Sequence, residues 1–118
     1  MGYQVVASPQ GDVLQIKLTG DTDGHADEIA RDVFEQIEAT RTRKLLIDTR
    51  QLKGRLGLGS MYLHMQRYPG NTPRLKTAVV DLPEHTEFAT FHELAAGNMG
   101  YSIRYFEDTK SAWDWLKN

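Results

Sequence analysis

A run of three consecutive apolar residues, Leu45-Leu46-Ile47, lies between Lys44 and Asp48 and limits what this chain can fold into. Adjacent residues of an extended strand point to opposite faces of a sheet, so an unbroken apolar run needs cover on both faces. Strands of this kind are typical of parallel sheets that lie between helices. The run therefore predicts an α/β fold, with helical segments near it in the chain.

The segment 23–40 carries such a helical pattern. Its apolar residues recur at intervals of three and four and form one stripe; they are Ala26, Ile29, Ala30, Val33, Phe34 and Ile37. Asp21 and Asp23 lie where an N-cap is expected, and Asp27 and Glu28 would stabilise the positive end of the helix dipole. We expect an amphipathic helix that begins at residue 23 or 24 and ends at residue 40.

The N-terminal segment predicts a β-hairpin. Residues 3–7 read as one strand and residues 13–19 as another, the second alternating apolar and polar side chains. Between them, Pro9 takes the second position of a turn, and Gly11 follows where a positive φ is expected. One face of this pair is expected to contact water.

The rest of the chain continues the alternation of strand and helix. Helices are predicted over 56–68, 83–97 and 109–117, and strands over 75–81 and 101–106. The full order is ββαβαβαβα, with no linker or repeat. This order predicts a single domain over residues 1–118, an α/β fold with a mixed, mainly parallel sheet and the hairpin at its edge or beside its centre.

Composition excludes several classes of protein. The 118 residues include no cysteine, which rules out a disulfide scaffold and a thiol nucleophile. No apolar window is long enough to insert stably in a membrane, and the N-terminus lacks the pattern of a signal peptide. The sequence therefore predicts a cytoplasmic protein.

Charge is unevenly distributed around a formal net value of −2. Residues 21–40 hold seven acidic residues against one arginine, residues 41–76 hold nine basic residues against one aspartate, and residues 81–118 are again acidic. Two interpretations stay open: solvated charges that pair between elements, or a basic surface that recruits an acidic partner. The overall balance does not favour a nucleic-acid partner.

No motif predicts catalysis or a bound metal. The glycine-rich segment 54–60 lacks the lysine of a phosphate loop, so Gly57 and Gly59 are interpreted as giving backbone freedom, and Ser60 as a helix cap. His85 and His92 lie about 11 Å apart on a helix, too far to share an ion. We therefore expect no enzyme activity, no cofactor and no metal site.

Three strings resemble the STAS domain family, the anti-sigma-factor-antagonist fold. They are 45–48 followed by a glycine-bearing turn, 76–80, and 103–106 followed by Ala112-Trp113-Asp114-Trp115-Leu116, and the resemblance spans nearly the whole chain. The last string is similar to the closing unit of the STAS/Sec14-like branch. The resemblance implies a regulatory module rather than an enzyme.

In that family a serine in an Asp-Ser-Ser-Gly turn is phosphorylated. Here Leu56, Gly57 and Leu58 occupy the corresponding positions, and a hydroxyl occurs only at Ser60. The classical serine switch is therefore expected to be absent. A phosphate at Ser60 would nevertheless meet a helix N-terminus and nearby basic residues; the candidate anion contacts are Arg50, Lys53 and Arg55.

The leading functional hypothesis is a protein-binding module whose contact surface spans residues 54–68. Its helix carries residue types that are enriched at interfaces, although a wide core-facing stripe would explain the same pattern. The candidate contact residues are Gly57, Gly59, Ser60, Leu63, His64, Arg67 and Tyr68. A homodimer is kept open. The alternative, implied by the Sec14-like resemblance, is a carrier or sensor of a small apolar, lipid-like ligand.

Overall fold

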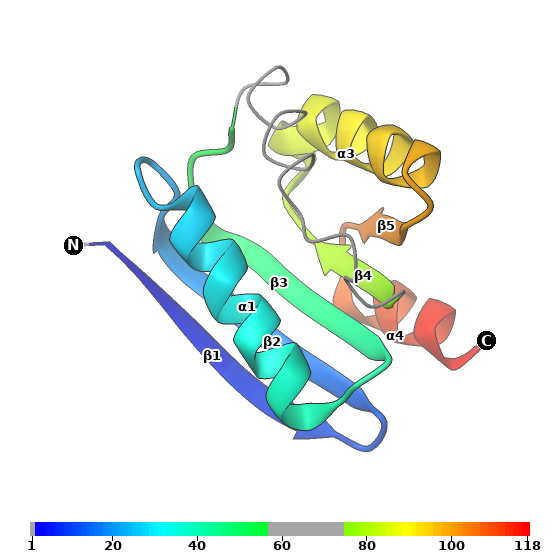
Figure 1. Cartoon of the computed structure of the whole chain (residues 1–118). Helices are drawn as coiled ribbons and strands as arrows, with labels where there is room; N and C mark the ends of the chain where they lie inside the picture. Colours follow the sequence, from blue (N-terminus) through cyan, green and yellow to red (C-terminus); the bar gives the residue numbers. More distant parts are fainter. Residues whose placement is uncertain (1, 57–74) are drawn as a thin grey trace.

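Five strands form one sheet in the order β1-β2-β3-β4-β5 (Figure 1). The computed structural model describes residues 2–56 and 75–118. The elements in chain order are β1 (Tyr3–Gln10), β2 (Val13–Asp21), α1 (Ala26–Thr40), β3 (Lys44–Lys53), β4 (Lys76–Val80), the 3-10 helix η1 (Pro83–His85), α3 (Thr86–Asn98), β5 (Ser102–Phe106) and α4 (Thr109–Lys117).

The sheet is mixed and mainly parallel, as the order of elements predicts. β1 and β2 are antiparallel, whereas β2, β3, β4 and β5 pair in parallel with their neighbours. The hairpin lies at the edge, which settles the alternative left open by the sequence. A parallel arrangement brings the carboxyl ends of β2 to β5 to one edge of the sheet.

Helices cover both faces of the sheet. Leu45 packs in the cluster that contains Ile29 and Ile37 of α1, and its neighbour Leu46 packs in the cluster that contains Leu116 of α4. Thr77 pairs with both Leu45 and Ile103, and Ile103 packs against α3. α1 and α3 therefore lie on one face and α4 on the other (Figure 1). The prediction that β3 is covered on both faces is confirmed.

The hairpin differs from the prediction at its turn. Pro9 does not lie in the turn but within β1, opposite Leu14, and the turn is formed by Gly11, with φ of 64°, and Asp12. β1 is an edge strand, and an edge strand tolerates proline where the missing N–H would point to solvent. The alternation in β2 is confirmed, since Leu14, Ile16 and Leu18 are buried.

α1 begins two to three residues later than predicted. Its N-cap is His25, which makes no side-chain capping bond, so neither Asp21 nor Asp23 caps the helix. Instead, Asp21 Oδ1 accepts a hydrogen bond from the N–H of Asp23 at 2.9 Å, within the turn that precedes α1. The acidic first turn is confirmed.

The C-terminal elements follow the prediction closely. Pro83 opens η1, which continues into α3, and α4 begins after Asp108, whose side chain accepts a hydrogen bond from the N–H of Ser111 at 2.7 Å. The helix predicted over 56–68 lies outside the described residues, apart from its first residue. Within residues 2–56 and 75–118, no helix is both long and apolar enough to cross a membrane.

Candidate functional site

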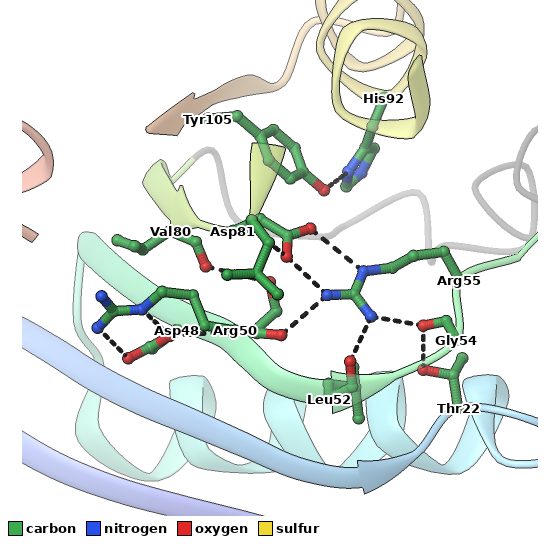
Figure 2. Close-up of polar contacts among 12 residues, drawn as sticks. Thr22, Asp48, Arg50, Leu52, Gly54, Arg55, Val80, Asp81, His92 and Tyr105 are labelled. Atoms are coloured by element: carbon green, nitrogen blue, oxygen red, sulfur yellow. Dashed lines mark hydrogen bonds and ion pairs between the residues drawn. The ribbon is translucent and has the colours of Figure 1, made fainter. Parts of the chain in front are cut away.

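The carboxyl-terminal edge of the parallel strands carries a connected set of polar side chains (Figure 2). In open α/β sheets, ligands usually bind outside the carboxyl ends of the strands. Arg55 lies here because β3 ends at Lys53 and Gly54 turns the chain with φ of 77°. Asp81 lies here because it follows the last residue of β4.

The guanidinium group of Arg55 forms the centre of this set. Its Nε and Nη2 atoms donate to the carboxylate of Asp81 at 3.2 and 2.7 Å. The remaining N–H groups donate to the carbonyl oxygens of Thr49 at 2.8 Å, of Leu52 at 2.7 Å and of Gly54. A guanidinium group has five N–H donors, so each donor of Arg55 has an acceptor within its own chain.

Burial strengthens this ion pair. The side chains of Arg55 and Asp81 are only 9% and 4% exposed. A buried charge is stable only when it is paired and hydrogen-bonded, and both conditions hold here. Asp81 also accepts a hydrogen bond from the N–H of Leu82 at 2.8 Å. The pair therefore joins the end of β3 to the end of β4.

Two threonines extend the network to the neighbouring strands. The hydroxyl of Thr49 donates to the carbonyl of Val80 at 3.1 Å, and the hydroxyl of Thr22 donates to the carbonyl of Gly54 at 3.1 Å. Thr22 follows β2, so these bonds connect the ends of three strands. Thr22, Thr49, Gly54, Arg55 and Asp81 thus form a hydrogen-bonded platform at this edge, directly before the chain continues into Leu56.

A second ion pair at this edge is more accessible. Arg50 donates to both carboxylate oxygens of Asp48 at 3.0 and 2.9 Å, and its side chain is 39% exposed. Partial burial alone would raise the pKa of Asp48, but the side-chain and backbone hydrogen bonds from Arg50 lower it below its usual value. The same hydrogen bond raises the pKa of Arg50.

The three candidate anion contacts differ in the partners that hold them. Arg50 is engaged by Asp48, and Arg55 is engaged by Asp81. Lys53 is exposed, and its carbonyl oxygen accepts a hydrogen bond from the N–H of Thr22 at 3.0 Å. An anion that approached either arginine would have to displace a carboxylate of this chain.

The candidate partner contacts cannot be placed. Gly57, Gly59, Ser60, Leu63, His64, Arg67 and Tyr68 lie outside the described residues.

Sequence reasoning missed Asp81 and the pair formed by His92 and Tyr105. Nδ1 of His92 lies 2.7 Å from the hydroxyl of Tyr105, and Glu93 accepts a hydrogen bond from the N–H of Tyr105 at 2.6 Å. These contacts attach α3 to β5. An aspartate directly after the buried run of β4 was a signal for Asp81, but no local pattern relates residues 92 and 105.

An apolar groove lies between α1, the sheet and α3. Its volume is about 220 Å³, and Arg55, His92 and Tyr105 are among the polar residues that line it. Leu56 and Leu75, the residues on either side of segment 57–74, both line it. The apolar wall includes Ile29, Val33 and Ile37 from α1, Leu45 and Val79 from the sheet, and Phe88 from α3.

Two solved structures are similar to this chain over nearly its whole length. A crystal structure of an anti-sigma factor antagonist from Mycobacterium paratuberculosis aligns with a TM-score of 0.56 at 15% identity, covering 99% of this chain and 96% of that one. The chain has the anti-sigma-factor-antagonist fold. An uncharacterized protein of the DUF3478 family with a SpoIIAA-like fold, from Shewanella loihica, aligns with a TM-score of 0.62 at 24% identity, covering 98% and 93%.

Neither a family model nor a curated protein matches the sequence. The STAS-like fold that the three strings predict is confirmed by the two structural neighbours, one of which is described as having a SpoIIAA-like fold.

Proposed function

We propose that this protein is a non-catalytic, cytoplasmic regulatory module with a STAS-like fold, and that it acts by binding a protein partner through residues 54–68. The observation that carries this proposal is the likeness in fold, over 99% of this chain, to a protein described as an anti-sigma factor antagonist. The platform formed by Arg55 and Asp81 supports it, because it fixes the chain where this segment begins.

The partner surface can be tested by cross-linking the full chain to its partner in the source cell and identifying the cross-linked peptides. A variant carrying Leu63→Asp and Arg67→Glu should lose the cross-link. Leu94→Asp serves as the matched control, since Leu94 is 65% exposed on α3 and lies outside the proposed surface. If the control variant lost the cross-link and the double variant kept it, the partner would contact another surface and the proposal would be wrong.

The classical serine switch is proposed to be absent. Gly57 and Leu58 offer no hydroxyl where the family's serines stand, and both Arg50 and Arg55 already have carboxylate partners. Incubation with an anti-sigma kinase and ATP should leave Ser60 without phosphate by peptide mass spectrometry. Stoichiometric phosphate at Ser60 that is needed for partner control would contradict this.

The apolar groove favours a second candidate function, a carrier or sensor of a small apolar ligand. Its volume of about 220 Å³ lies below the range of roughly 300 Å³ upward that is usual for drug-sized ligands, so the ligand would be small or partly exposed. Native mass spectrometry of protein purified from its source should show a ligand mass that Ala30→Phe removes. A bare chain mass would argue against this candidate, and the same spectrum distinguishes a monomer from a homodimer.

A further inference from the structure

We infer that the outer edge of β1 is a docking site for an extended, basic segment of a protein partner, which pairs with β1 and adds a sixth strand to the sheet. This surface lies apart from residues 54–68, so the inference does not depend on the proposed function. It rests on three observations: the direction of the β1 backbone groups, the composition of β1, and the charge of the helix flank above it.

The backbone of β1 presents hydrogen-bonding groups outward at every second residue. The N–H of Asp21 donates to the carbonyl of Gly2 at 2.9 Å, so this facing pair is hydrogen-bonded. Facing pairs in an antiparallel ladder alternate between hydrogen-bonded and non-hydrogen-bonded. The backbone groups of the even-numbered residues of β1 therefore bond to β2, whereas the backbone N–H and C=O groups of Tyr3, Val5 and Ala7 point away from β2, toward the open edge. In the sheet of the described residues, no strand pairs with this side of β1.

β1 lacks most of the features that protect an exposed edge. Natural edge strands are blocked by charged residues, bulges or prolines. Residues 3–10 contain no charge, and their pairing with β2 shows no irregularity in register. Pro9 belongs to the same alternate set as Tyr3, Val5 and Ala7 but has no N–H to donate, so it blocks pairing only at the C-terminal end of β1. Pairing is thus open along Tyr3, Val5 and Ala7.

The flank of α1 beside this edge is acidic. Asp32 and Glu35 line a surface hollow of about 380 Å³ together with Tyr3 and Val5. The hydroxyl of Tyr3 donates to Asp32 Oδ2 at 2.6 Å. The pKa of the Tyr3 phenol is raised to about 12. The largest cause is this hydrogen bond, followed by desolvation of the phenol and by the negative charges of Asp32 and Glu28. Among the described residues, Arg31 is the one cation near Tyr3 that opposes this shift, so the carboxylates of Asp32, Glu35 and Glu28 leave the flank with excess negative charge.

These features together define the partner. Backbone pairing to an open edge gives affinity without sequence preference, and the side chains at alternate positions give specificity. Every second side chain of an added strand would lie on the α1 side of the sheet, next to Asp32 and Glu35. Lysine or arginine at those positions would complement the carboxylates, and the charge match would speed association. A second copy of this chain fits less well, because β1 carries no basic residue.

The probe is a capped six-residue peptide in which lysine alternates with threonine, titrated into the full chain and followed by amide NMR shifts. A peptide with glutamine in place of lysine tests the contribution of charge. The lysine peptide should shift the amides of Tyr3, Val5 and Ala7 to saturation, with at least fivefold higher affinity than the glutamine peptide. Equal affinities, or saturable shifts confined to other strands, would overturn the inference.

Variants separate backbone pairing from simple charge attraction. Ala7→Pro removes an outward N–H that does not serve β2, and it should weaken the lysine peptide at least fivefold. Glu35→Gln should weaken it severalfold, whereas Glu38→Gln, on the same helix but outside the hollow, should not. If Ala7→Pro does not fold, a lysine peptide with alternate N-methyl groups replaces it as the test on the native chain. Unchanged affinity in that test, or β1 amides that shift on dilution without peptide, would refute the docking site.

Discussion

Replacing Arg55 by methionine should lower the free energy of unfolding by about 3–5 kcal/mol, the usual effect of removing one partner of a buried ion pair. Asp81 would keep its charge in a site where it is 4% exposed, with no cation beside it. The carbonyl groups of Thr49, Leu52 and Gly54 would each lose a donor, at about 1 kcal/mol apiece. The whole free energy of unfolding of a domain is usually only about 5–15 kcal/mol, so this loss would be a large part of it.

Urea unfolding followed by far-UV circular dichroism measures this loss. Arg50→Met is the matched control, because the exposed pair of Arg50 with Asp48 should contribute no more than about 1 kcal/mol. Combining Arg55→Met with Asp81→Leu should recover part of the loss, since no buried charge remains, but not the part due to the carbonyl groups. A loss for Arg55→Met no greater than that for Arg50→Met would refute the reasoning.

Three further predictions follow from single contacts. Gly20→Ala should destabilise the hairpin and lower the melting temperature in thermal denaturation, because φ is 104° and a Cβ would lie 2.5 Å from Cα of Tyr3. Asp32→Asn should lower the pKa of Tyr3 from about 12 toward 10, measured by NMR titration of the phenol. Because the pKa of Asp48 is lowered in the folded state, its ionised carboxylate stabilises the fold at pH values above the usual aspartate pKa. This stabilisation is lost as the pH falls through the pKa of the folded state, so Asp48→Asn should make the free energy of unfolding less sensitive to acid.

Periodicity predicted the elements because burial imposes it directly on the sequence. The three adjacent apolar residues of β3 are covered on both faces, and the stripe of α1 packs on one face. Boundaries were less predictable. Proline favours turns, so the sequence predicts a turn at Pro9, but the edge position of β1, a tertiary property, allows proline within the strand. α1 likewise begins without a side-chain cap, although two aspartates precede it.

The candidate site was only partly predictable. The three basic residues at the end of β3 could be found from the excess of positive charge in 41–76. The partner of Arg55 could not be found, because Arg55 and Asp81 are separated by 26 positions and meet only through the pairing of β3 with β4. A sequence shows which groups carry charge, whereas the register of the sheet decides which charges remain available to a ligand.

The sequential strand order has a consequence for how the chain folds. Among the strands within residues 2–56 and 75–118, each pairs with the strand that precedes it, and none inserts between two others. The strand-to-strand contacts therefore form between neighbouring units, which keeps the entropy of loop closure low for the sheet, and of the described helices only α4 reaches back to both β2 and β3. During synthesis, the hairpin of β1 and β2 emerges first, and each later strand meets an edge that is already formed. We expect the sheet to grow in the direction of translation.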